Sequence, residues 1–216
     1  NILIVDDDRG GSLEESYRSD LLHRQIPCQI WDKQKSHTPP DTILDDYRMV
    51  IWFTGDSTAD YLSETDINAM KHYLDHGGSL FLTGQGLARE LHNEDSAFLA
   101  DYLHANYCGK VYSIDYLGDT NSIIGNNLRI RFAGATNQVT GEGGQVLPVN
   151  GAVPVFRPNK SCPGYSVISY DGDYRLVFMT FGYEAVPDNP GIFTGRDTLL
   201  ARILSYMSPW ANPVCV

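Results

Sequence analysis

Basic residues are scarce in this sequence of 216 residues. It has 16 Lys and Arg against 27 Asp and Glu, which gives a formal net charge of −11. A chain with this balance repels phosphates and anionic lipid surfaces, so we expect no nucleic-acid partner. No apolar run approaches the roughly 18–20 residues that a bilayer-spanning helix needs, so we expect no membrane insertion either.

Cysteines are few, and their positions Cys28, Cys108, Cys162 and Cys215 show no CxxC or Cys/His spacing. A zinc site built from these cysteines is therefore not predicted. They allow several disulfide pairings, and the sequence does not choose between a disulfide and unpaired, partly buried thiols. A signal-peptide pattern is also lacking. The chain begins without Met in a strand-like segment, which we interpret as a mature product or an excised domain.

Short apolar runs alternate with helical patterns in the first half of the chain. The run at residues 2–5 is continuously apolar, and the runs at 47–53 and 79–83 are mainly apolar, which is typical of parallel strands covered on both faces. Helical stripes follow them, and Ser63 with Asp66 has the spacing of a capping box at the start of one helix. Repeated strand–loop–helix units with short connections predict a doubly wound, mainly parallel α/β sheet.

The pattern changes after about residue 107. Residues from about 108 to 175 contain short alternating strands separated by Gly, Asn and Pro turns, among them a strand at 110–116. A strongly apolar run at 175–181 and a helical stretch at 196–206 follow. We predict one domain over residues 1–216, with a β-rich insertion before the chain returns to the parallel sheet for its last strand and helix.

The turn Gly84-Gln85-Gly86 joins the apolar run at 79–83 to a helical pattern. A sharp strand-to-helix turn of this kind usually presents a Ser or Cys nucleophile at its centre. A carboxamide cannot be activated as a nucleophile by a neighbouring base. The turn therefore predicts the backbone shape of a catalytic elbow without its chemistry.

Several segments, taken in chain order, together resemble the class I glutamine amidotransferase-like superfamily, which has a flavodoxin-like fold. A closer resemblance is to domains of unknown function in large secreted bacterial and archaeal proteins, which accompany immunoglobulin-like modules or peptidases of the immune-inhibitor-A type. The segments are Ile2-Leu3-Ile4-Val5-Asp6-Asp7-Asp8, Val50-Ile51-Trp52-Phe53-Thr54-Gly55-Asp56, Gly77-Gly78-Ser79-Leu80-Phe81-Leu82-Thr83-Gly84-Gln85, Phe98-Leu99-Ala100-Asp101-Tyr102-Leu103-His104-Ala105 and Phe178-Met179-Thr180-Phe181-Gly182-Tyr183-Glu184-Ala185.

The resemblance also implies what this chain has lost. Active amidotransferases carry Cys at the elbow and a His followed by Glu after the last strand, whereas this chain has Gln85 and Tyr183-Glu184. We therefore expect a non-catalytic scaffold or binding module of a secreted or cell-surface protein, with no required cofactor. Its expected partners are other domains of a larger parent protein or copies of itself.

Loops that follow parallel strands converge at one edge of a doubly wound sheet, where ligands bind. This rule places Asp7, Asp8, Thr54, Asp56, Gln85 and Glu184 around one crevice, and we predict that they bind a ligand there. Oxygen ligands suit Ca²⁺ or Mg²⁺, for which Asp6, Asp7 and Asp56 are the candidates. Alternatively, Asp7 or Asp8 caps the first helix or bonds turn amides, with Arg9 as an ion-pair partner.

Three other interpretations stay open. Asp7 and Glu184 would form the acid/base pair of a glycan hydrolase if their carboxyl groups faced each other about 5–9 Å apart. The β-rich region would pair with neighbouring copies if the chain were a structural subunit of an extracellular assembly or filament. His72 and His76 have i, i+4 spacing and could share a metal, but residue 73 is Tyr and a solvated helix face is favoured.

Overall fold

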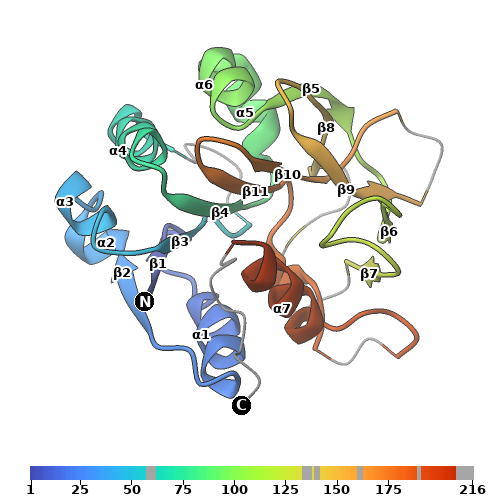
Figure 1. Cartoon of the computed structure of the whole chain (residues 1–216), viewed down its shortest axis with the longest axis horizontal. Helices are drawn as coiled ribbons and strands as arrows, with labels where there is room; N and C mark the ends of the chain where they lie inside the picture. Colours follow the sequence, from blue (N-terminus) through green and yellow to red (C-terminus); the bar gives the residue numbers. More distant parts are fainter. Residues whose placement is uncertain (57–61, 133–137, 139–141, 160–162, 189–190, 208–216) are drawn as a thin grey trace.

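The computed structural model describes residues 1–56, 62–132, 138, 142–159, 163–188 and 191–207, and Figure 1 shows the path of the chain. The strands are β1 (Ile2–Asp6), β2 (Cys28–Asp32), β3 (Met49–Phe53), β4 (Ser79–Thr83), β5 (Ala105–Lys110), β6 (Asp115–Gly118), β7 (Arg129–Arg131), β8 (Gly144–Pro148), β9 (Val153–Pro158), β10 (Val167–Asp171) and β11 (Arg175–Met179). The helices are α1 (Glu14–His23), α2 (Lys33–Ser36), α3 (Asp41–Leu44), α4 (Glu64–Asp75), α5 (Leu87–Glu94), α6 (Ser96–Asp101), the 3₁₀ turn η1 (Tyr183–Ala185) and α7 (Arg196–Met207).

The described strands form one nine-stranded sheet, in the order β2-β1-β3-β4-β11-β10-β9-β6-β7, and a separate β5–β8 ladder. The first five strands of this order pair in parallel. The remaining strands of the large sheet pair antiparallel. The predicted doubly wound, flavodoxin-like α/β fold is confirmed, and β11 returns to the parallel sheet beside β4 as expected.

Helices cover both faces of the parallel half (Figure 1). Side chains alternate along β1, so that Ile4 packs in one core with Tyr17 and Leu21 of α1. Its neighbour Val5 packs in the other core with α4 and α5. This two-sided burial explains why the central parallel strands β1, β3 and β4 are mainly apolar.

The β-rich insertion widens the sheet. Strands β6, β7, β9 and β10 all come from it, and a tight turn after Asp171 joins β10 to β11 in an antiparallel hairpin. The prediction of a single strand at 110–116 is wrong, because β5 ends at Lys110 and β6 begins at Asp115. Between them, Ser113 Oγ bonds the backbone of Asp115 at both its N–H and its carbonyl oxygen, which competes with strand pairing.

The helix starts were only partly predicted. Ser63 and Asp66 form the expected capping box at α4. Helix α1 begins at Glu14, and the residue before it, Leu13, makes no side-chain cap bond. Asp8 reaches across the preceding loop instead and accepts a hydrogen bond from Leu13 N at 3.2 Å. Among the described helices, none has the length and apolar character needed to cross a bilayer.

Candidate functional site

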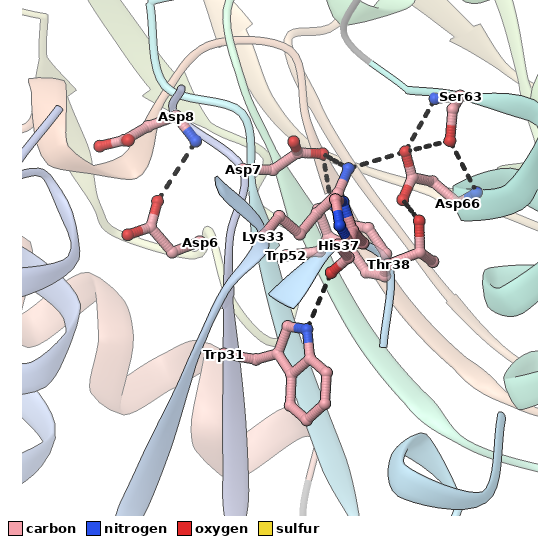
Figure 2. Close-up of polar contacts among 10 residues, drawn as sticks. All are labelled: Asp6, Asp7, Asp8, Trp31, Lys33, His37, Thr38, Trp52, Ser63 and Asp66. Atoms are coloured by element: carbon pink, nitrogen blue, oxygen red, sulfur yellow. Dashed lines mark hydrogen bonds and ion pairs between the residues drawn. The ribbon is translucent and has the colours of Figure 1, made fainter. Parts of the chain in front are cut away.

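The carboxyl end of β1 sends consecutive aspartates to opposite sides. Figure 2 shows Asp7 turned toward Lys33, while Asp6 and Asp8 lie together on the other side of the strand end. This follows from the alternation of side chains along an extended chain. The predicted crevice residues are therefore divided among separate polar clusters.

Lys33, at the start of α2, forms the centre of one cluster with Asp7, Trp52 and Asp66, which we call the Lys33 cluster. Its ammonium Nζ lies 2.6 Å from Asp7 Oδ2 and 2.7 Å from Asp66 Oδ2. The indole N–H of Trp52 donates to the same Asp7 oxygen at 3.0 Å. The Lys33 side chain is only 13% exposed, so the cluster is largely shielded from water.

The Lys33 ammonium forms ion pairs with two carboxylates, those of Asp7 and Asp66. Burial works against ionisation of Asp66, but hydrogen bonds from Lys33, Ser63 and Thr38 outweigh it and lower the Asp66 pKa. Burial raises the pKa of Asp7 to about 6, although Lys33 and Trp52 act in the opposite direction. Asp66 is therefore the fixed negative partner of Lys33, and Asp7 is the group that gains a proton first.

A pocket of about 1100 Å³ opens beside the Lys33 cluster. Its lining combines the carboxyl edge of the sheet with the first turn of α4 and with α5, and it includes Arg9, Glu64, Arg89 and Glu94. Six Asp or Glu and three Lys or Arg line it, so its wall is acidic on balance. A pocket of this size and polarity suits a hydroxylated or positively charged ligand better than an anion.

Asp6, Asp8 and Glu14 form a second cluster, in which one carboxylate oxygen of each lies within 4.8 Å of the others. Asp8 accepts hydrogen bonds from the N–H groups of Gly10 and Leu13, and Asp6 accepts one from Asp8 N. Burial and the neighbouring Asp8 charge raise the Asp6 pKa. The expected bonding of turn amides by Asp8 is thus observed.

The three aspartates predicted to bind a cation are not brought together. Among the described carboxylates, Asp6 is grouped with Asp8 and Glu14, while Asp7 is held by Lys33. Asp56 lies half-buried in the loop after β3. Binding of Ca²⁺ or Mg²⁺ stays a prediction, and Asp6, Asp8 and Glu14 are the carboxylates within reach of one ion.

The elbow after β4 has the predicted shape. The N–H of Gln85 donates to Gly55 O at 3.0 Å, and Gly86, the residue before α5, has a left-handed φ of 78°. A Cβ on Gly84 would lie 1.8 Å from Thr54 Oγ1, so only glycine fits there. The Gln85 residue is only 3% exposed, so the side chain at the centre of the elbow faces protein rather than solvent.

Glu184 lies in η1 after β11 and is enclosed by a third set of polar groups. Tyr17 donates to Glu184 Oε2 at 2.5 Å, and Gln138 donates to Oε1 at 2.6 Å. The Gln138 amide oxygen accepts from Gly182 N at 2.8 Å, which closes the network. Burial raises the pKa of Glu184 to about 7, and the negative charges of Asp56 and Asp8 add to this effect.

Sequence reasoning missed three residues that define these clusters. Tyr17 and Gln138 are 167 and 46 residues away from Glu184, and no local pattern connects residues at such separations. Lys33 had a usable signal, because it directly follows a strand whose carboxyl end belongs to the same sheet edge as Asp7. Asp66 was recognised only as a helix cap, although its carboxylate also holds Lys33.

Comparison with known proteins identifies the fold. No protein-family model matches the chain, and no curated protein sequence matches it. A Thermoplasma acidophilum protein described as a candidate GMP synthase component is similar, with a TM-score of 0.62 and 10% identity over 97% of this chain and 94% of that one. A candidate ThuA-like protein of Bacteroides uniformis is similar with a TM-score of 0.59 and 12% identity, covering 95% and 90% of the two chains.

A glutamine amidotransferase of Methylobacillus flagellatus is also similar, with a TM-score of 0.54 and 12% identity over 85% of this chain and 69% of that one. Identities this low establish the fold and nothing about activity. The chain therefore has the fold of class I glutamine amidotransferase-like and ThuA-like proteins.

Proposed function

We propose that this chain is a non-catalytic, amidotransferase-like binding module of a secreted or cell-surface protein. The observation that carries the proposal is the buried amide of Gln85 at the elbow, where acyl transfer needs an exposed nucleophile. A second observation supports it: after β11 the chain supplies Glu184, whose oxygens are bound by Tyr17 and Gln138. The elbow keeps a backbone shape but has no group that attacks a carbonyl.

Binding, in this proposal, takes place in the pocket beside the Lys33 cluster. The acidic excess of its wall favours a ligand that carries amines, and the ammonium of Lys33 is already held by Asp7 and Asp66. The exposed carboxylates Glu64 and Glu94 line this pocket from α4 and α5. These carboxylates are available to a cationic ligand, because the Lys33 ammonium is bonded to Asp7 and Asp66 instead.

The glycan-hydrolase alternative has little support from the geometry. Asp7 bonds Lys33 and Trp52, whereas Glu184 bonds Tyr17 and Gln138. A pair of catalytic carboxyls needs a shared open space for the sugar. These two carboxyls are instead committed to different buried partners.

The test of lost catalysis is ammonia release from L-glutamine by the purified chain, with an active glutaminase as the positive control. We expect no release above the blank. Saturable release that copurifies with the chain would contradict the proposal.

The test of binding uses spermidine as a small cationic probe in a thermal-unfolding titration. We expect a concentration-dependent rise in melting temperature that the double variant Glu64→Gln/Glu94→Gln loses. Glu15→Gln removes one exposed charge on α1, away from the pocket lining, and should keep the response. An equal response in all three proteins would assign it to the net charge of −11 rather than to the pocket.

A second candidate, a structural subunit of an extracellular assembly, is favoured by one observation. Six of the eight large apolar side chains exposed in the described residues fall between positions 112 and 192: Tyr112, Ile114, Ile123, Leu147, Val153 and Ile192. Exposed apolar side chains mark a site for association where they form a contiguous patch, and these residues would supply such a patch if the β-rich part pairs with another copy. Light scattering across a concentration series should show oligomers if copies associate, and Ile123→Lys should weaken them. A protein that stays monomeric at every concentration would exclude the hypothesis of self-association.

A further inference from the structure

We infer that Asp45, His72 and His76 form a binding site for a Zn²⁺-like divalent transition-metal ion at the junction of α3 and α4. These side chains lie outside the pocket and the elbow. One ligand atom from each lies within 4.8 Å of the others. His72 Nε2 is 3.1 Å from Asp45 Oδ2, close to the roughly 3.3 Å that separates two ligands of a tetrahedral zinc ion.

The two imidazoles are arranged as metal ligands. They stand one turn apart near the end of α4, with ring centroids 4.1 Å apart. His76 Nδ1 lies 2.8 Å from the backbone oxygen of His72, and because a carbonyl only accepts, Nδ1 carries the proton. The Nε2 atom of His76 is therefore left with a lone pair for a metal.

A second carboxylate, that of Asp41, lies near the other side of the His72 ring. With Nε2 directed at Asp45, its other nitrogen, Nδ1, lies 3.8 Å from Asp41 Oδ2. At this distance the Asp41 carboxylate is not hydrogen-bonded to the ring, but its negative charge favours a cation at the site. Asp41 begins α3 and Asp45 caps its carboxyl end, so both carboxylates come from one short helix.

The chemistry of the donors selects the metal. Two imidazole nitrogens and one carboxylate suit Zn²⁺ and its neighbours, whereas Ca²⁺ and Mg²⁺ prefer oxygen ligands alone. The site lies at the carboxyl-terminal end of α4, where the helix dipole favours a cation. Water would complete the coordination, because Asp45 and His76 are exposed.

The experiment measures zinc affinity of the EDTA-stripped chain by competition with a chromophoric chelator. We expect one site, weakened at least about tenfold by His76→Gln and less strongly by Asp41→Asn, which removes only a nearby negative charge. His23→Gln removes an exposed imidazole near the end of α1 and should leave the affinity unchanged.

A second readout is spectroscopic. Co²⁺ added in place of Zn²⁺ should give visible d–d bands in the wild type and in His23→Gln, and no such bands in His76→Gln. Circular dichroism checks that each variant is folded. Equal zinc affinity in the wild type and His76→Gln, loss of binding in His23→Gln, or no detectable site in the wild type would overturn the inference.

Discussion

Replacing Glu184 by Gln should make the protein more stable, although it removes a residue with two short hydrogen bonds. Burial raises the pKa of Glu184 from 4.5 to about 7. The folded protein therefore holds this proton more tightly than the unfolded chain between pH 4.5 and about 7. In that window the free energy of unfolding falls as the pH rises, and above about pH 7 the full cost of the buried charge is present.

The magnitude follows from the pKa difference. A change of one in a pKa corresponds to about 1.4 kcal/mol, so the buried charge costs on the order of 3 kcal/mol at pH 8 and under about 1 kcal/mol at pH 5. Glutamine keeps the shape of the side chain: its oxygen can accept from Gln138, and its amide can donate to the Tyr17 hydroxyl. The variant should therefore gain about 3 kcal/mol over the wild type at pH 8 and little at pH 5.

The assay is urea denaturation followed by circular dichroism at pH 5, 6, 7 and 8. Only the difference between variant and wild type is interpreted, because Asp6 and Asp7 also have raised pKa values and remain in both proteins. Glu15→Gln, at an exposed ion pair on α1, should change stability by less than about 0.5 kcal/mol at every pH. A difference for Glu184→Gln that stays constant from pH 5 to 8, or a loss of stability at pH 8, would refute the reasoning.

Two further predictions concern the Lys33 cluster and the elbow after β4. Lys33→Met leaves Asp7 and Asp66 without their shared cation. It should lower the free energy of unfolding by about 3–5 kcal/mol at pH 8, measured by urea denaturation. The cost should shrink at pH 5, where Asp7 takes up a proton, and an equal cost at both pH values would contradict the assignment. Gly84→Ala places a Cβ against Thr54 Oγ1 and should lower stability by about 1–3 kcal/mol, whereas adding Thr54→Ala should recover part of this loss.

The fold was predictable because the central parallel strands carry their own signal. The mainly apolar runs of β1, β3 and β4 report burial on both faces, and the Ser63–Asp66 capping box marks a helix start. The irregular part was harder, because the break at Ser113 depends on hydrogen bonds of one hydroxyl rather than on hydrophobic pattern. Strand boundaries there reflect local competition for the backbone.

The candidate site was predictable only as a location. Strand ends give the edge at which Asp7, Gln85 and Glu184 emerge, but not the direction in which each side chain turns. Asp7 turns toward Lys33, and Glu184 turns back toward Tyr17 because Gly182 leaves room: a Cβ there would lie 1.9 Å from Glu184 Oε1. Such directions depend on partners far away in the chain, and no single segment of sequence encodes them.

The position of β11 has a consequence for how this protein is made. It lies between β4 and β10 in the middle of the sheet, yet it is the last strand of the described chain. Until residues 175–179 leave the ribosome, β4 presents an unpaired edge and the antiparallel half has nothing to join. Before β11 has been synthesised, the apolar surfaces that it will cover stay partly exposed. Synthesis is therefore the period in which the chain is most prone to aggregate with other chains.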